Sequence, residues 1–304
     1  MTPIRIATRK SKLALWQANW VKDQLEKADL ASELVLIETI GDKKLDTSIS
    51  KIGSKGVFTQ ELEDQLADGL VDIAVHSAKD LSATLPEGFQ LIAFGPRAHV
   101  TDVLVSDKEI SLDTSLVIGS SSTRRVAQLA KHFPLFNCVP VRGNLQTRIE
   151  KLKAGACDAL LLARAGVERM DLGHLIKHEF SLDLLTPAAG QGSVAIEAHK
   201  SLRLAKRKLI RAALNDLAAE RVVTCERAFL KKLEGGCSIP VFAHADLGAD
   251  TLYLQGGILS LDGKQFISKT GTGDDPDELG QRVAQEVLTS GGEAILKEIK
   301  KQLD

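Results

Sequence analysis

The sequence has few cysteines, few aromatic residues and almost no net charge. Its four cysteines form no Cys-x-x-Cys pair and have no histidine at zinc-finger spacing, so we predict neither a disulfide framework nor a metal site. A formal net charge of −1 argues against a nucleic-acid partner bound over a broad basic surface. The Gly-x-Ser-x-Gly, Walker A and Gly-x-Gly-x-x-Gly motifs are also missing, which argues against the common hydrolase, nucleotidase and dinucleotide-binding classes.

Long apolar segments are missing as well. No apolar run approaches the roughly 18 residues that a membrane-spanning helix needs. The first residues, MTPIRIATRKSK, lack the apolar stretch of a signal peptide. We therefore expect a soluble, cytoplasmic protein without a membrane partner. A hydrophobic content of 44% over 304 residues allows well-packed cores, and this length favours two or three domains.

Apolar periodicity predicts a repeated strand–helix pattern. Strands are expected at 4–8, 33–40, 71–77, 115–120, 137–141 and 158–163, with helices between them at 13–28, 58–70, 122–133 and 145–155. Such alternation is typical of largely parallel sheets with helices on their faces, and it favours two similar α/β domains. Candidate linkers are 94–101 and 186–193.

The last third of the chain follows a different pattern. One or two charged helices are expected over 203–234, three short alternating strands over 241–248, 252–261 and 264–271, and one final helix over 277–303. Strands bracketed by helices predict a smaller α+β domain.

Two segments with hydroxyl groups and cations each follow a strand and open a helix. They are ATRKSKLALWQA, residues 7–18, and SSSTRRVAQLA, residues 120–130. Helix N-termini favour anions because of their free N–H groups and the helix dipole. Ordinary N-capping by serine or threonine is the alternative for either segment alone. Their occurrence in both predicted domains favours an anion site.

Further cations lie near predicted strand ends or in glycine turns, where open α/β sheets bind ligands. They are Lys51, Lys55, Arg142, Arg148, Arg164 and Arg169. Arginine can bond both oxygens of a carboxylate or phosphate at once. Since the chain has no excess of positive charge, this concentration is local, and it predicts a small polyanion as the ligand.

Asp80 and Cys237 are the candidates for chemistry. Asp80 in HSAKDL follows a predicted strand, and a carboxylate there can transfer protons or stabilise a developing cation. A turn or helix cap is the alternative for Asp80, and a structural role is expected for His76. Cys237 in LEGGCSIP follows a helix that ends on glycine, so its thiol is expected on a loop. An unreactive thiol, a nucleophile and a cofactor attachment point all remain open for it.

Several segments in register resemble the porphobilinogen deaminase, or hydroxymethylbilane synthase, family. They are RIATRKSKLALWQ, GDKKLD, KIGSKGVFTQELE, DIAVHSAKDL, IGSSSTRR, VRGNLQTR, AGQGS and LEGGCSIP. The resemblance implies an α/β fold with two periplasmic-binding-protein-like (type II) domains around a cleft, plus a small α+β C-terminal domain. The implied domains are 1–97 together with 194–213, then 98–193, and finally 214–304.

The resemblance also implies an activity. Four porphobilinogen molecules are condensed head to tail, each with loss of ammonia, onto a covalently held dipyrromethane primer. Hydrolysis then releases hydroxymethylbilane for haem and chlorophyll biosynthesis. Cys237 is the implied thioether attachment of the dipyrromethane cofactor, and Asp80 is the implied catalytic carboxylate. A monomer is implied, which hands its product to uroporphyrinogen-III synthase.

The residues implied to bind cofactor or substrate carry cationic or hydroxyl side chains. They are Arg9, Ser11, Lys79, Ser121, Ser122, Arg124, Arg125, Arg142, Arg148 and Arg169. Of these, Lys79, Arg124 and Arg125 are implied to hold mainly the cofactor.

A mobile loop over the site is implied for Lys51, Gly53, Lys55 and Gly56. The sequence also departs from the usual family pattern. Ser82 replaces a proline after Asp80, and the segment RAHVTD carries His99, Val100 and Thr101 in place of other residues. These departures leave the rigidity of the turn after Asp80 and the behaviour of the first linker open.

Two alternatives come from other classes of protein. A non-enzymatic anion-binding protein of the periplasmic type would share the cleft and the arginines but would not need Cys237. A thiol enzyme would use Cys237 as its nucleophile with a histidine base, for which His244 is nearest in sequence. A pyrrole bound covalently to Cys237 would exclude both alternatives.

Overall fold

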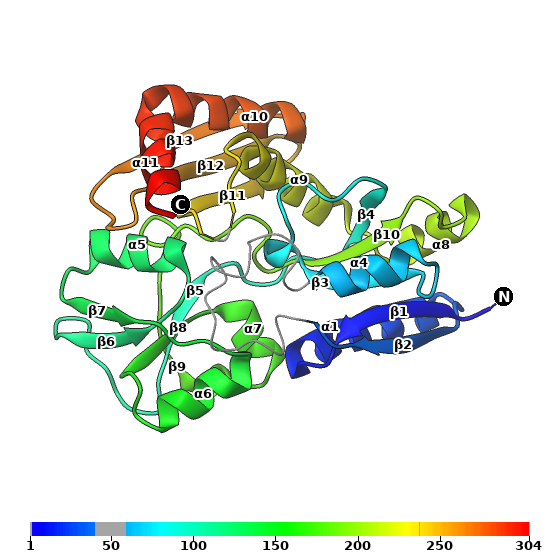
Figure 1. Ribbon diagram of the computed structural model, residues 1–304, viewed down its shortest axis with the longest axis horizontal. Coiled ribbons are helices and arrows are strands. Elements are labelled where there is room, and N and C mark those ends of the chain that lie inside the picture. The colour runs from blue at the N-terminus through cyan, green and yellow to red at the C-terminus, as the bar shows by residue number, and fades with distance from the viewer. Residues whose placement is uncertain (1, 40–58, 237, 304) are drawn as a thin grey trace.

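A computed structural model of the chain describes residues 2–39, 59–236 and 238–303. These residues form three bodies, each built on its own sheet (Figure 1). Two bodies have a five-stranded sheet with helices on its faces, and the third has a three-stranded sheet with the C-terminal helices (Figure 1). The expected fold class is therefore confirmed. None of the described helices combines the length and the apolar content that crossing a membrane requires.

The first sheet has the order β2-β1-β3-β10-β4. Its strands are β1 (Ile4–Arg9), β2 (Ser32–Ile37), β3 (Ile73–Ser77), β4 (Phe89–Phe94) and β10 (Val194–His199). Strands β1, β2 and β3 are parallel, whereas β10 runs antiparallel to both β3 and β4. The helices that pack on this sheet are α1 (Lys12–Lys27), α4 (Gln60–Ala67) and α8 (Leu204–Leu214).

Helix α1 shows how the sequence fixes these elements. Val21 and Leu25 recur at helical spacing and are fully buried in one core with Ile6 of β1. Ser11 caps the helix, because its hydroxyl accepts a hydrogen bond from the backbone N–H of Ala14 at 3.3 Å. The helix therefore starts directly at the end of β1, and the polar residues between the two elements lie at the edge of the sheet.

The second sheet repeats this arrangement in the order β7-β6-β8-β5-β9. Its strands are β5 (Asp102–Val105), β6 (Leu116–Gly119), β7 (Phe136–Val139), β8 (Ala159–Ala163) and β9 (Ile176–Glu179). Its helices are α5 (Thr123–His132), α6 (Leu145–Lys153) and α7 (Arg164–Arg169). Strand β5 is antiparallel to both of its neighbours, as β10 is in the first sheet. The chain leaves the first sheet after β4 and returns to it at β10. Two crossing segments therefore join the two bodies, the first crossing at 95–101 and the second at 180–193.

The third body begins with a long helix and ends with two shorter ones. Its strands are the antiparallel β11 (Val241–Leu247), β12 (Leu252–Leu259) and β13 (Phe266–Gly273). Its helices are α9 (Leu217–Lys232), α10 (Pro276–Val287) and α11 (Glu293–Leu303). Phe229 of α9, Leu254 of β12 and Val283 of α10 are fully buried in the same core.

The structure corrects the expected elements in two respects. The single helix expected over 277–303 is wrong, because Gly291 has a φ of 114° and separates α10 from α11. Strands β4, β5, β9 and β10 and helix α7 were not expected at all. All five of these elements are only four to six residues long, and such short runs show too little periodicity to be identified.

The described cysteines behave as core residues. Cys157 and Cys225 are buried, and Cys138 is half-buried. Burial raises the pKa of all three thiols, that of Cys225 to about 12. None of these thiols is therefore an effective nucleophile near neutral pH.

Candidate functional site

Strand β3 leads directly into a single helical turn, Ala78–Asp80, which places Lys79 and Asp80 at the end of the strand. The backbone N–H of Ala78 donates to the carbonyl of Ser193 in the second crossing segment at 3.0 Å. Gly190 of that segment has a φ of +76°, and a Cβ there would lie 2.9 Å from the Ala78 side chain. The turn is thus packed tightly against the crossing, in a position that accepts only glycine.

Asp80 is exposed and lines a small cavity of about 70 Å³ in the first body. The polar residues around this cavity come from the ends of β1 and β3, from the start of α1 and from the residue before α4. They are Arg9, Ser11, Gln17, Thr59, His76 and Ser77. The structure therefore places Arg9 and Ser11 at the same cavity as Asp80.

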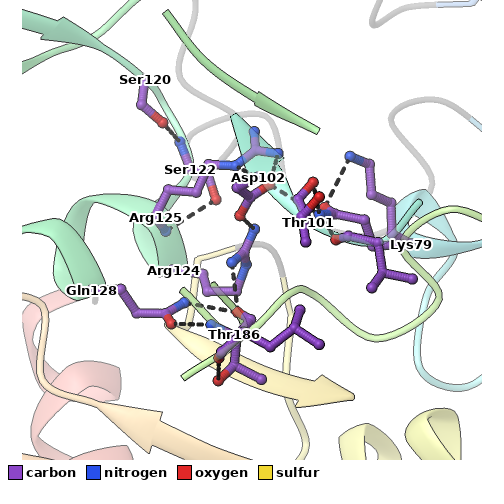
Figure 2. A network of polar contacts seen from close by, with 12 residues as sticks. Lys79, Thr101, Asp102, Ser120, Ser122, Arg124, Arg125, Gln128 and Thr186 are labelled. Atoms are coloured by element: carbon purple, nitrogen blue, oxygen red, sulfur yellow. Dashed lines mark hydrogen bonds and ion pairs between the residues drawn. The ribbon is translucent and has the colours of Figure 1, made fainter. Parts of the chain in front are cut away.

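Two adjacent arginines at the start of α5 bind a single carboxylate that is completely buried. Arg124 Nη2 lies 2.7 Å from Asp102 Oδ2, and Arg125 Nη2 lies 2.7 Å from Asp102 Oδ1 (Figure 2). Arg124 also donates to the carbonyl of Thr186 at 2.7 Å. Burial alone would raise the pKa of Asp102, but the two guanidinium groups outweigh it and hold this pKa well below its usual range.

Lys79 is connected to this carboxylate through Gln191 of the second crossing segment. Lys79 Nζ donates to Gln191 Oε1 at 3.4 Å, and Gln191 Nε2 donates to Asp102 Oδ1 at 2.9 Å. The same amide donates to the carbonyl of Val100 in the first crossing at 2.6 Å. Burial, followed by repulsion from Arg125, lowers the pKa of Lys79 to about 8. One network therefore joins the two α/β bodies and ends on a half-buried amine beside Asp80.

Arg142 and Arg148 lie on either side of the glycine turn between β7 and α6. Arg148 Nε donates to the carbonyl of Gly143 at 2.8 Å, which folds the side chain back over the turn. Burial lowers the pKa of Arg148, repulsion from Arg125 lowers it further, and attraction to Asp80 opposes both. Arg148 is therefore close enough to interact electrostatically with the candidate catalytic carboxylate and with the arginine pair.

The remaining predicted residues lie on the second body. Ser122 caps α5, and the hydroxyl of Ser121 donates to the carbonyl of Val141 at 3.2 Å. The guanidinium of Arg169 lies over the ring of Trp16 in α1, 5.1 Å from its centroid. It thus forms a contact between the two α/β bodies, close to the start of α1.

Five predicted residues lie outside the residues that the structure describes. They are Cys237 of the proposed attachment loop and Lys51, Gly53, Lys55 and Gly56 of the proposed mobile loop. The structure therefore leaves these predictions untested.

A buried acid–histidine pair lies beside the Asp80 cavity. His76 Nε2 is 3.0 Å from Glu197 Oε2, and both side chains are buried. Burial raises the pKa of nearby Glu63, and the charge of Glu197 raises it further. The structural role expected for His76 agrees with its burial against Glu197.

Glu226 of α9 connects the third body to both crossing segments. Its carboxylate is fully buried and lies 2.7 Å from Arg97 Nη1 in the first crossing. It also accepts hydrogen bonds at 2.7 Å from the backbone N–H groups of Gly190 in the second crossing and Ala245 in β11. One carboxylate thus fixes the point at which all three bodies meet.

Four buried polar residues of this region were not predicted from the sequence. They are Asp102, Gln191, Glu197 and Glu226. A weak signal existed for Asp102, because the adjacent pair Arg124 and Arg125 needs a counter-charge if it is buried. The partner could not be identified without the fold, since it lies 22 residues away from Arg124.

The fold and the site define an α/β protein with a cation-rich site for a small polyanionic ligand, arranged around one exposed carboxylate. The family model described as "Porphobilinogen deaminase, dipyromethane cofactor binding domain" matches residues 4–207. The model described as "Porphobilinogen deaminase, C-terminal domain" matches residues 221–289. The chain therefore belongs to the porphobilinogen deaminase family, and the resemblance seen in the sequence is confirmed.

Curated relatives match over nearly the whole chain. The porphobilinogen deaminase of Desulfosudis oleivorans is 51% identical, with 98% of both chains covered. That of Cytophaga hutchinsonii is 53% identical, with 99% of this chain and 98% of the relative covered. Among solved structures, the VFT2 domain of Bordetella pertussis BvgS has a TM-score of 0.45 and 10% identity, covering 74% of this chain and 91% of that domain. The family assignment depends on the family models and the sequence relatives, and not on this structural likeness.

Proposed function

We propose that this site condenses porphobilinogen with Asp80 as its catalytic carboxylate and Cys237 as the attachment point of dipyrromethane. Membership of the porphobilinogen deaminase family supplies the reaction, namely stepwise condensation of four porphobilinogen molecules and release of hydroxymethylbilane. The observation that carries the residue assignment is the position of Asp80, exposed at a cavity and within electrostatic reach of Lys79 and Arg148. Those are the surroundings expected for a carboxylate that works on anionic pyrroles.

The residues present fit a dipyrromethane group. Each pyrrole carries an acetate and a propionate, so the group is a polyanion with N–H donors. Burial and the charge of Arg125 lower the pKa of both Lys79 and Arg148, so Arg125 lies close enough to repel both cations. A bound carboxylate would relieve this repulsion. Ser122 at the N-terminus of α5 adds a hydroxyl and a helix end that favours anions.

We propose the following residues as the ligands of the cofactor and substrate carboxylates: Arg9, Ser11, Lys79, Ser121, Ser122, Arg124, Arg125, Arg142, Arg148 and Arg169. Lys79, Arg124 and Arg125 would hold mainly the cofactor. The other arginines would hold incoming substrate or the growing chain. Loss of one two-pronged arginine contact should weaken binding by about 1.5–3 kcal/mol.

When bound, dipyrromethane supplies the pyrrole to which porphobilinogen units are added. Asp80 accepts hydrogen bonds from pyrrole N–H groups and stabilises positive charge that develops on the ring. It also holds or receives the proton that must move when a new bond forms and ammonia leaves. Because Lys79 is adjacent to Asp80, it can bind a pyrrole carboxylate while Asp80 contacts the ring.

The domain bounds, a mobile loop, the cellular location and the oligomeric state belong to the same proposal. We propose domains at 1–97 with 194–213, at 98–193 and at 214–304, and a mobile loop that includes Lys51, Gly53, Lys55 and Gly56. We also propose a cytoplasmic monomer that passes its product to uroporphyrinogen-III synthase. Light scattering of the purified protein tests the monomer directly.

Covalent attachment at Cys237 is tested by intact-protein mass spectrometry and peptide mapping. We expect a mass excess of two linked pyrrole units on the peptide that contains Cys237, and no excess in Cys237→Ser. The matched control is Cys138→Ser, which should retain the modification because the thiol of Cys138 is half-buried and unreactive. A thiol at position 237 that stays bare after incubation with porphobilinogen would contradict the proposal.

The pKa of Lys79 predicts a pH dependence of substrate binding. Because burial and Arg125 lower this pKa to about 8, the ammonium is present below pH 8 and is lost as the pH rises through that value. Although Lys79 would hold mainly the cofactor, its charge also attracts the anionic substrate that must reach the same site. KM should therefore rise by about tenfold once the charge is lost.

Steady-state kinetics of Lys79→Arg and Lys79→Gln test this assignment. Lys79→Arg keeps its charge and should show no rise in KM across pH 8. Lys79→Gln should show a high KM at every pH. A wild-type KM that does not change across pH 8 would refute the role given to Lys79.

A further inference from the structure

Arg227 of α9 reaches out of the third body to the chain segment that follows Asp80. Its Nη2 donates to the carbonyl of Ser82 at 2.8 Å and to the carbonyl of Ala83 at 3.4 Å. Burial lowers the pKa of this guanidinium, and attraction to the buried carboxylate of Glu197 opposes that effect. The half-buried guanidinium of Arg227 is thus hydrogen-bonded to two backbone carbonyls within three residues of Asp80.

The hydrogen bonds before, within and after the turn that carries Asp80 show what Arg227 contributes. On its preceding side, Ala78 N–H is bonded to Ser193 in the second crossing. Within the turn, the hydrogen bond from Leu81 N–H to the carbonyl of Ala78 is long, at 3.4 Å. After the turn, Leu81 is buried in an extended conformation, with φ −78° and ψ 144°. The bonds from Arg227 therefore hold the end of the turn that the crossing does not reach.

The position of Arg227 in α9 adds a second argument. The preceding residue, Glu226, binds Arg97 and Gly190 of the two crossing segments. Consecutive residues of one helix thus hold the crossings and the Asp80 turn at the same time. Helix α9 ends at Lys232, shortly before position 237 in the chain. The helix that precedes the proposed attachment point is therefore also bonded to the segment that presents the proposed catalytic carboxylate.

We propose that Arg227 is a positioning residue for Asp80. By holding the carbonyls of Ser82 and Ala83, it fixes the turn in the orientation from which Asp80 meets the pyrrole ring. The inference rests on the proposed catalytic role of Asp80. Misplacing a reacting group by about 1 Å can cost on the order of 100-fold in rate, so a contact of this kind has a measurable effect on kcat.

The test is the kinetics of Arg227→Gln with the cofactor content of each preparation measured by mass spectrometry. We expect kcat per loaded enzyme to fall by about 10–100-fold, with KM for porphobilinogen changed by less than about twofold. Arg227→Lys can still bond one carbonyl and should lie between wild type and Arg227→Gln. It also keeps the test valid if Arg227→Gln fails to fold.

Arg221→Gln is the matched control. Arg221 lies on the same helix, and its Nη2 also donates to two backbone carbonyls, those of Asp250 at 2.8 Å and Asp274 at 3.1 Å. Those carbonyls belong to the loops of the third body, away from Asp80. Arg221→Gln should therefore leave kcat unchanged. An equal loss of kcat in Arg221→Gln and Arg227→Gln would overturn the proposal, because it would indicate a general effect on α9.

A second-site change separates positioning from general stability. Leu81 already has the extended conformation that a residue before proline requires, so Ser82→Pro should fit and should stiffen the turn. Combined with Arg227→Gln, Ser82→Pro should restore kcat by about tenfold. Unchanged kcat in Arg227→Gln, or a loss that Ser82→Pro does not reverse, would overturn the inference. Full activity of Asp80→Asn would instead overturn the proposed role of Asp80, which distinguishes the two failures.

Discussion

Replacing Asp80 by asparagine is expected to slow condensation by about 10²–10⁴-fold, while binding of porphobilinogen changes little. The reason is the position of the side chain, which is exposed at a cavity with Arg9 and Ser11 and does not support the fold. Asparagine keeps the size of the side chain and can still accept a hydrogen bond. It loses the negative charge and the ability to take up a proton, and these are the properties that the proposed chemistry uses.

Single-turnover and steady-state kinetics of the cofactor-loaded variant measure this effect. Asp68→Asn is the matched control, because Asp68 is exposed at the end of α4 in the same body. It should keep the wild-type kcat. An Asp80→Asn variant with more than about a tenth of the wild-type kcat would exclude general acid–base catalysis by this residue.

Replacing Asp102 by asparagine should lower the free energy of unfolding by about 3–5 kcal/mol, the largest effect expected for any single residue of the site on stability. The substitution leaves the buried guanidinium groups of Arg124 and Arg125 without their counter-charge. It also disturbs the amide of Gln191, which donates to the same carboxylate. Because the pKa of Asp102 is held well below its usual range, the stabilisation is complete above about pH 4 and is lost only as the pH falls further.

Urea denaturation of the variant tests this expectation. Glu179→Gln provides the comparison, since Glu179 pairs with Arg164 at 2.7 Å but both side chains are partly exposed. Solvent screens such a pair, so its loss should cost no more than about 1 kcal/mol. Similar losses in the two variants would show that the buried network around Asp102 is not what holds the two α/β bodies together.

Within the two α/β bodies, the parallel strands could be predicted from sequence, whereas the antiparallel strands could not. Strands such as β3 follow clear apolar runs between helical patterns. Strand β10 pairs with partners that lie more than 90 residues earlier in the chain, and it carries the buried charge of Glu197 in its apolar run. The local residue pattern does not identify a partner strand that is distant in the chain, and a charged residue usually indicates an exposed position.

The site was predictable to a similar degree. Serines and paired cations at helix starts carry a local signal, which is why Ser11, Ser122 and Arg125 could be assigned to an anion site. Asp102 and Gln191 acquire their roles only from neighbours that are distant in sequence, 23 residues away in the case of Arg125 and Asp102. Local motifs therefore identify the groups that we propose to meet the ligand more readily than the groups that hold them in place.

The place of β10 in the first sheet has a consequence for synthesis of the chain on the ribosome. Strands β3 and β4 are not neighbours, because β10 lies between them and is made only after the whole second sheet. The second sheet needs no residue beyond Glu179, whereas the first needs residues up to His199. The nascent chain therefore completes its second body first, and β4 emerges about 100 residues before the strand that pairs with it. Until β10 has been synthesised, the amino-terminal body exposes an unpaired strand. This stage of translation is therefore the one at which a chaperone would be most useful.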